Sequence, residues 1–134
     1  MLARTPSHLT VDRALLDPWR RLLLDGADLI ERKGHAKYTL CDQDTGAVCA
    51  RGALIGEEHL QKRCGWWDVE ISVAVSEYPM AKISATLARV AYDADQRLAS
   101  YLGNCDHVPD WNNAPERTAA EVISAMRACA LGDL

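Results

Sequence analysis

The chain has 134 residues, of which 49% are hydrophobic and 25% are charged, and its formal net charge is −4. These values are ordinary for a globular protein, and the length predicts one domain over residues 1–134. Residues 1–9 are expected to form a flexible arm. The negative charge and the lack of a long Lys/Arg run argue against a nucleic-acid partner, because phosphate binding needs a concentrated positive face.

The segment after the arm contains the clearest helix signal. Asp17 followed by Pro18 is typical of a helix start, with an acid at the cap and proline at the first position. Apolar residues then recur on one face until Gly34, which stands where a left-handed C-terminal cap belongs. We therefore expect a helix from Pro18 to the residue before Gly34.

The middle of the chain shows strand-like patterns. Residues 37–41 and 47–50 flank a five-residue turn that ends in glycine, which predicts a short β-hairpin. β-Branched residues alternate with others over 69–75, which predicts a strand that joins the hairpin as a third one. Between these elements a helix is expected from about Gly52 to about Lys62.

Helical spacing returns in the last third of the chain. Apolar residues recur in steps of three and four from Met80 to Leu102, which predicts a long amphipathic helix. Residues 105–114 are expected to form a loop, and Thr118 with Glu121 makes a capping-box pattern before a final helix. The predicted fold class is α+β, mainly α, with three to four helices around a small antiparallel β-hairpin or three-stranded sheet.

Two adjacent tryptophans are candidate partner-binding residues. Trp66 and Trp67 lie in an expected extended segment, where neighbouring side chains point to opposite faces, so one of the two can be left exposed. Exposed tryptophan is a favoured anchor for protein partners, and the strand expected at 69–75 would offer an edge to a partner or to a second copy. The alternative is a core pair divided between two layers.

The segment before the final helix is a second candidate binding site. Asn112, Asn113 and Arg117 would form a polar pocket beside Trp111 and a helix N-terminus, which suits a carboxylate, a phosphate or a peptide end. In the alternative, which we favour, Trp111 plugs the core, the amides bond loop carbonyls and Arg117 pairs with a carboxylate.

Cys49 is the candidate nucleophile, although no catalytic residue is assigned from the sequence. It precedes a helix start, where the helix dipole would lower the pKa of its thiol. It would pair with His35, His59 or His107 as a thiolate–imidazole couple. In the favoured alternative, Cys49 packs in the core as a small hydrophobic residue, because no family-specific cysteine signature is present.

The candidate metal ligands lack the spacing that metal sites need. Cys105-Asp106-His107 has no paired C-x₂₋₄-C or H-x₃₋₅-H partner, so zinc is not assigned. Asp42 and Asp44 lack the final glutamate of a calcium-binding loop and are expected to bond their own turn. No metal and no cofactor is predicted.

The five cysteines are odd in number and irregularly spaced. The chain also shows no apolar run of the kind that forms a signal peptide or a membrane span. We therefore expect reduced thiols in a soluble, cytoplasmic protein without a membrane partner.

Several motifs appear together in this chain. They are Gly34 after the first helix, Cys49-Ala50-Arg51-Gly52-Ala53-Leu54, Trp111-Asn112-Asn113 and Arg117-Thr118-Ala119-Ala120-Glu121-Val122. Over about residues 13–130 the chain thereby resembles a family of small uncharacterised proteins from actinobacteria and their phages. It departs from the family pattern at His35, where tryptophan is usual, and at Asn113, where aspartate is usual. The resemblance implies an architecture and an origin but no activity.

Two classes of function follow from these patterns. The favoured one is a small soluble accessory protein, phage or actinobacterial, that acts by binding a host protein or a second copy of itself. The other is a small enzyme that uses Cys49 or the Trp111–Arg117 loop on a small molecule. Whether the protein is an enzyme stays open, and a non-enzymatic protein is favoured because the sequence does not bring a nucleophile, a base and an orienting group together.

Overall fold

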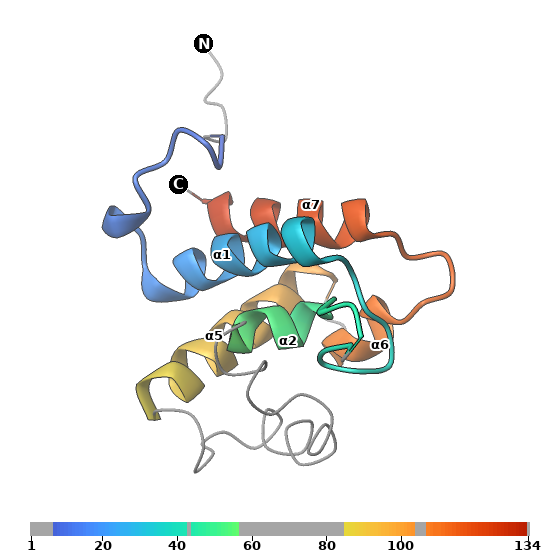
Figure 1. Ribbon diagram of the computed structural model, residues 1–134. Helices are drawn as coiled ribbons and strands as arrows, with labels where there is room; N and C mark the ends of the chain where they lie inside the picture. Colours follow the sequence, from blue (N-terminus) through green and yellow to red (C-terminus); the bar gives the residue numbers. More distant parts are fainter. Residues whose placement is uncertain (1–6, 43, 57–84, 104–106, 134) are drawn as a thin grey trace.

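The computed structural model describes residues 7–42, 44–56, 85–103 and 107–133 (Figure 1). In chain order its elements are the 3₁₀ turn η1 (Arg13–Leu15) and the helices α1 (Pro18–Lys33), α2 (Ala50–Ile55), α5 (Ala85–Tyr101), α6 (Val108–Asn112) and α7 (Ala119–Leu131). Figure 1 shows α1 and α7 side by side and running in opposite directions, with α2 and α5 beneath them. Among these helices, none is long and apolar enough to cross a bilayer.

Helix α1 begins and ends where the sequence predicted. Pro18 lies in its first turn, and the backbone N–H of Arg20 donates to the carbonyl of Asp17 at 3.0 Å. Gly34 has a φ of 101°, which side chains disfavour, and its N–H donates to the carbonyl of Ile30. A proline at the start and a glycine at the end therefore set the bounds of α1.

Small residues let α1 approach its neighbours closely. A Cβ atom on Gly26 would lie 2.9 Å from Met126 Cε on α7 and 3.3 Å from the Ala53 Cβ on α2. A larger residue at position 26 would therefore require the end of the Met126 side chain to shift and would crowd Ala53. The core around it consists of buried aliphatic side chains from both layers, among them Leu23, Leu24, Leu54 and Leu98.

A side chain of α1 also caps the end of α7. Arg20 Nη1 donates to the carbonyl of Ala130 at 2.8 Å and to that of Gly132 at 2.6 Å, and the arginine is 9% exposed. The last carbonyls of a helix have no partner within the helix itself. Arg20 supplies that partner from a residue 110 positions away in the chain.

Charged residues hold η1 against the helical layers. Arg13 Nη1 donates to Asp25 Oδ1 and to Asp28 Oδ2, each at 2.7 Å. Asp28 also accepts from Arg127 on α7 at 2.9 Å. Burial raises the pKa of Asp28, but the hydrogen bonds from both arginines outweigh it and leave this pKa below its ordinary value. Asp28 is therefore a shared ionised acceptor that joins η1, α1 and α7.

The predicted α+β fold is wrong, because the described ranges are helical and contain no strand. In place of a hairpin they show two isolated bridges, one between His35 and Val48 and one between Cys41 and Val48. Tyr38 has a φ of 65°, so the backbone turns where the first strand would have to be extended. The strand predicted at 69–75 lies outside the described residues.

The turn between the two expected strands is nevertheless present. Asp42 Oδ1 accepts from the backbone N–H of Asp44 at 2.8 Å and from that of Thr45 at 3.1 Å. The Gly46 N–H donates to the Asp42 carbonyl, and Gly46 has a φ of 79°. The prediction that Asp42 bonds its own turn is thereby confirmed.

Helix α2 differs from its predicted bounds at both ends. It begins at Ala50, two residues early, with Cys49 as its N-cap, and it ends at Ile55 because Gly56 adopts a φ of 97°. Residues from 57 to the predicted end at Lys62 lie outside the described ranges. A Cβ on Gly52 would overlap the carbonyl group of Leu40, so the loop and α2 pack against each other at this glycine.

The long helix predicted from Met80 is present as α5 from Ala85, and residues 80–84 lie outside the described ranges. The loop predicted at 105–114 contains a short helix, α6, which the sequence analysis missed. Pro109 lies in its first turn, where the absent proline N–H leaves no hydrogen bond unmade. The proline that suggested a loop is therefore compatible with a helix start.

The capping box before α7 is confirmed. Thr118 Oγ1 accepts from the Glu121 N–H at 3.2 Å, and Glu121 Oε1 accepts from the Thr118 N–H at 3.0 Å. Hydrogen bonds from the backbone N–H and then the hydroxyl of Thr118 lower the pKa of Glu121. The two residues thus satisfy two backbone groups at the start of the helix.

Replacement of Thr118 by alanine is expected to lower the free energy of unfolding by about 1 kcal/mol, because the N-cap acceptor is lost. Chemical denaturation of both proteins measures this difference. Ser124→Ala on the exposed side of the same helix is the matched control and should change stability by less than about 0.5 kcal/mol. Equal effects of the two substitutions would contradict the role of the capping box.

Candidate functional site

The candidate binding residues fall into two groups. Trp66 and Trp67 lie outside the described residues, so their role as partner anchors stays a prediction. Trp111 and Asn112 lie on α6, and Arg117 lies in the connection to α7. For the second group, the structure can be compared with the two alternatives given above, an anion-binding pocket and a loop whose polar groups are bonded internally.

Asn112 is the hydrogen-bonding centre of this region and is 1% exposed. Its Oδ1 accepts from His35 Nε2 at 2.8 Å and from the Ala50 N–H at 3.0 Å. Its Nδ2 donates to the carbonyl of Ala36 at 3.0 Å and to Asn113 Oδ1 at 3.0 Å. A primary amide offers two donors and accepts two bonds at its oxygen, so the hydrogen-bonding capacity of Asn112 is used inside the protein.

A second set of bonds fastens the loop after α1 to the same region. Asn113 Oδ1 accepts from the backbone N–H of Tyr38 at 2.9 Å, which holds the left-handed conformation of that residue. Lys37 Nζ donates to the carbonyls of Ala114 and Pro115 at 2.7 and 3.1 Å. The conformation of the segment around Tyr38, which was predicted to be a hairpin strand, is therefore determined by residues about 75 positions later in the chain.

Arg117 and Trp111 contact each other. The Arg117 guanidinium lies 4.2 Å from the centre of the Trp111 ring, and its Nε donates to the Trp111 carbonyl at 3.1 Å. Nη1 of the same arginine donates to Glu121 Oε2 at 3.2 Å. Trp111 packs half-buried against the core. These contacts agree with the bracing alternative, in which the loop's polar groups are satisfied internally.

Cys49 occupies a structural position at the start of α2. Its sulfur accepts from the Gly52 N–H at 3.2 Å, as an N-cap side chain does. Burial raises the pKa of this thiol and outweighs the opposing effect of the hydrogen bond from Gly52. Of the proposed histidine partners, His35 donates to Asn112, His107 lies 3.5 Å from Arg51, and His59 is outside the described residues. The thiol is thus held neutral rather than activated.

The described cysteines are expected to resist alkylation in the folded protein. Cys41, Cys49 and Cys129 are buried free thiols, and burial raises the pKa of Cys129 to about 11. At pH 8 a thiol with that pKa has a thiolate fraction about one hundredfold lower than a thiol of pKa 9, which slows its reaction with iodoacetamide. Peptide mass spectrometry with and without denaturant measures the rates. Fast labelling of Cys49 in the folded protein would restore the nucleophile hypothesis.

A buried ion pair links α2 to α5. Arg51 Nε and Nη2 donate to the two carboxylate oxygens of Asp95 at 3.1 and 3.2 Å, and these side chains are 7% and 3% exposed. His107 Nε2 lies 3.5 Å from Arg51 Nη1. This pair was not predicted from the sequence, although a carboxylate on the apolar face of α5, beside Ala94 and Leu98, was a usable signal.

The metal hypotheses gain no support. Cys105 and Asp106 lie outside the described residues, and elsewhere in the described ranges no group of three or more potential metal ligands comes together. The bonds made by Asp42 go to its own turn.

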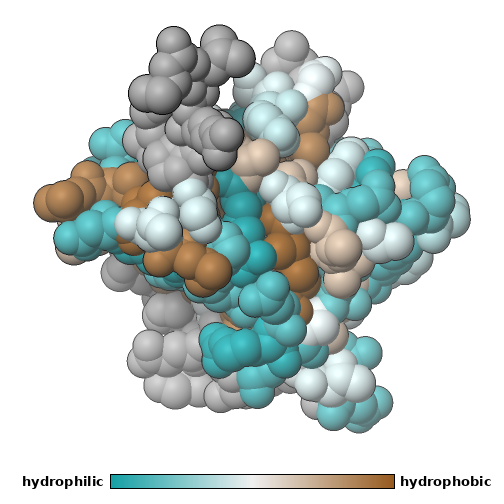
Figure 2. All heavy atoms as spheres, turned by 90° about the horizontal axis from the view of Figure 1, so that it is seen from above, coloured by the Kyte–Doolittle hydropathy of each residue, from teal (hydrophilic) through white to brown (hydrophobic). Residues whose placement is uncertain are grey.

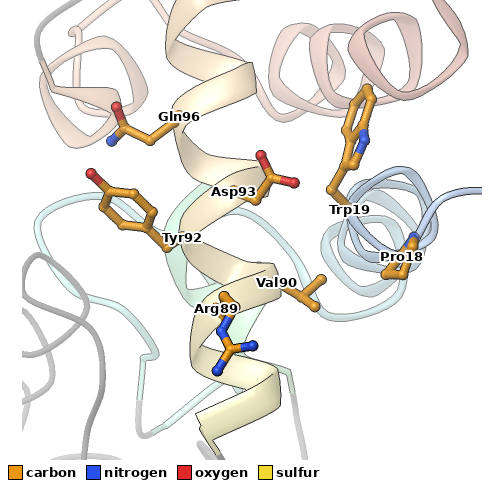
Figure 3. Close-up of a pocket in the computed structure, with 7 residues that line it drawn as sticks. All are labelled: Pro18, Trp19, Arg89, Val90, Tyr92, Asp93 and Gln96. Atoms are coloured by element: carbon orange, nitrogen blue, oxygen red, sulfur yellow. The ribbon is translucent and has the colours of Figure 1, made fainter.

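An open groove runs between the start of α1 and the outer face of α5 (Figure 3). Its volume is about 340 Å³, and its surface is mostly apolar. The seven lining residues are Pro18 and Trp19 from α1 and Arg89, Val90, Tyr92, Asp93 and Gln96 from α5. The apolar spacing after Pro18 and from Met80 to Leu102 predicted two amphipathic helices but not the groove between them.

Charged groups fix one wall of this groove. The guanidinium carbons of Arg20 and Arg97 lie 4.4 and 4.2 Å from the centre of the Trp19 ring. Arg97 Nε also donates to Asp93 Oδ1 at 2.9 Å. The Trp19 ring is therefore held from α1 and from α5 at once, so the groove is formed before any ligand arrives.

These observations define a small helical domain that carries an open surface groove and a braced connection between α6 and α7. The chain belongs to a family of unknown function, DUF6197, which matches residues 16–131. This confirms the resemblance to an uncharacterised family. The matched range holds Asn112, the Arg51–Asp95 pair and every residue that lines the groove. Comparisons with curated proteins and with solved structures gave no match.

Proposed function

We propose that this protein is a non-enzymatic binding module that docks another polypeptide in the groove between α1 and α5. The observation that carries the proposal is the groove itself, an open and mostly apolar concavity with a rigid tryptophan wall. Enclosed pockets bury most of a small ligand, whereas an open groove leaves much of one exposed. A polypeptide gains further contact outside the groove and therefore suits it better.

Three candidate residues in the described ranges are engaged inside the protein. The amide of Asn112 is used in internal hydrogen bonds, and Arg117 is bonded to Trp111 and Glu121. Cys49 is buried, and burial raises the pKa of its thiol. In contrast, Tyr92 in the groove is 45% exposed. Aromatic residues at such surfaces are frequent anchors for protein partners.

Site-specific photocrosslinking tests this proposal. The resemblance noted above suggests an actinobacterial or phage origin, so the partner is sought in actinobacterial cells, and self-association through the groove is included. The protein carries p-benzoylphenylalanine in place of Tyr92, or in place of Ala120 on the exposed side of α7 as a control. We expect a crosslinked polypeptide from position 92 and none from position 120.

A blocked groove provides the second arm of the test. Val90→Lys places a charged chain in the apolar part of the groove and should abolish the adduct formed from position 92. No adduct from position 92, or an adduct that forms equally from position 120 or survives Val90→Lys, would overturn the proposal.

A further inference from the structure

We infer that the groove selects a partner segment in which a large apolar side chain stands next to a carboxylate. This inference rests on the proposed function and names the chemistry of the polypeptide that docks there. Two features of the groove carry it, namely an apolar part of defined size and one cation at its end (Figure 3).

The apolar part fits a large side chain. Pro18, Trp19 and Val90 form one side, as Figure 3 shows, and Tyr92 lies across the helix from them. The whole groove has a volume of about 340 Å³, which is larger than one aromatic side chain. Burial of a Leu or Phe side chain is worth about tenfold to one hundredfold in affinity. This contact supplies most of the binding strength.

The charges in the groove are unevenly paired. Asp93 is neutralised by Arg97, which donates to it at 2.9 Å. Arg89 forms no hydrogen bond or ion pair with any residue of the described ranges. Figure 3 shows its guanidinium at the end of α5 that is farthest from Gln96, with Val90 between it and Asp93 along the helix. The groove therefore carries one uncompensated positive charge, and a carboxylate on the partner complements it.

The apolar contact and the ion pair with Arg89 have different roles in binding. An exposed ion pair contributes about two- to fivefold in affinity, less than the apolar contact. Reversal of the charge at position 89 replaces this attraction by a smaller repulsion of about one and a half- to twofold, so the total change is roughly three- to tenfold. Arg89 thus selects and orients the segment, while Trp19 and Val90 retain it.

A random-peptide display library tests this specificity. Peptides that bind the blocked variant Val90→Lys are first removed, and peptides that bind the wild-type protein are then selected. The procedure is repeated with Gln96→Trp as a second blocked variant for the removal step. Circular dichroism confirms that both variants are folded. We expect the selected peptides to share a large apolar residue next to Asp or Glu, and replacement of that apolar residue by alanine should cost about tenfold or more.

Synthetic versions of these peptides are then titrated against charge variants. Arg89→Glu should weaken binding roughly three- to tenfold, Arg89→Lys should retain most of it, and a peptide with Lys in place of its acid should recover affinity for Arg89→Glu. Ala120→Glu/Ser124→Glu changes the net charge equally on exposed positions of α7 and should have little effect.

The possible failures are distinguishable. Peptides that depend on the open groove but bind wild type and Arg89→Glu equally, or that carry Lys or Arg in place of the acid, overturn the acidic specificity and leave the proposed function standing. A selection that enriches no peptide dependent on the open groove overturns both.

Discussion

Asp95→Asn is expected to lower the free energy of unfolding by about 3–5 kcal/mol. The substitution keeps the size of the side chain and removes its charge, so the buried Arg51 guanidinium loses the carboxylate that lies 3.1 Å from its Nε. Chemical denaturation with extrapolation to water measures the loss. Asp93→Asn two residues earlier is the matched control, because it breaks an exposed pair with Arg97 and should cost less than about 0.5 kcal/mol.

Removal of the whole pair separates charge burial from packing. Arg51→Met with Asp95→Leu replaces both charges by apolar groups of similar size and should recover most of the stability that Asp95→Asn loses. If the single substitution were as mild as the Asp93 control, the pair would not be the electrostatic link between α2 and α5 that its geometry indicates.

Asn112→Ala is expected to lower the free energy of unfolding by about 2–6 kcal/mol. It leaves the backbone N–H of Ala50 and the carbonyl of Ala36 buried without their partners, at about 1–3 kcal/mol for each group. Thermal and chemical unfolding measure the effect. Asn113→Ala serves as control and should cost less, because it removes the exposed bond to the Tyr38 N–H and one bond from Asn112, whereas Asn112→Ala removes four bonds.

The outcome also distinguishes the two interpretations of the α6–α7 segment. A bracing residue lowers stability when it is replaced, whereas a ligand-binding residue is often removed without loss of stability. An Asn112→Ala protein as stable as wild type would return this asparagine to the list of candidate binding residues.

Local signals predicted both ends of α1 and the start of α7. Asp17-Pro18 and Gly34 bounded α1, and Thr118 with Glu121 marked the start of α7. These features act within a few residues of each other, because a cap satisfies backbone groups of its own helix. Neighbouring residues therefore contain the information that determines where such a helix begins.

Local sequence patterns could not reveal that the predicted hairpin does not form. Residues 37–41 alternate like a strand, but the bonds that shape this loop come from Asn112, Asn113 and the carbonyls of Ala114 and Pro115. Contacts between distant segments override strand propensity where they satisfy the backbone in another way. The groove was missed for the same reason, since its two sides come from α1 and α5.

The pairing of α1 with α7 has a consequence for the synthesis of this protein. Arg20 contacts Ala130 across 110 residues of chain, and a ribosome needs on the order of ten seconds to add that many residues. Throughout this interval the nascent α1 has no α7 to cover its apolar stripe, so part of that surface is available to chaperones or to other nascent chains. Completion of the core is therefore a late event, timed by the emergence of α7 rather than by the speed at which α1 itself folds.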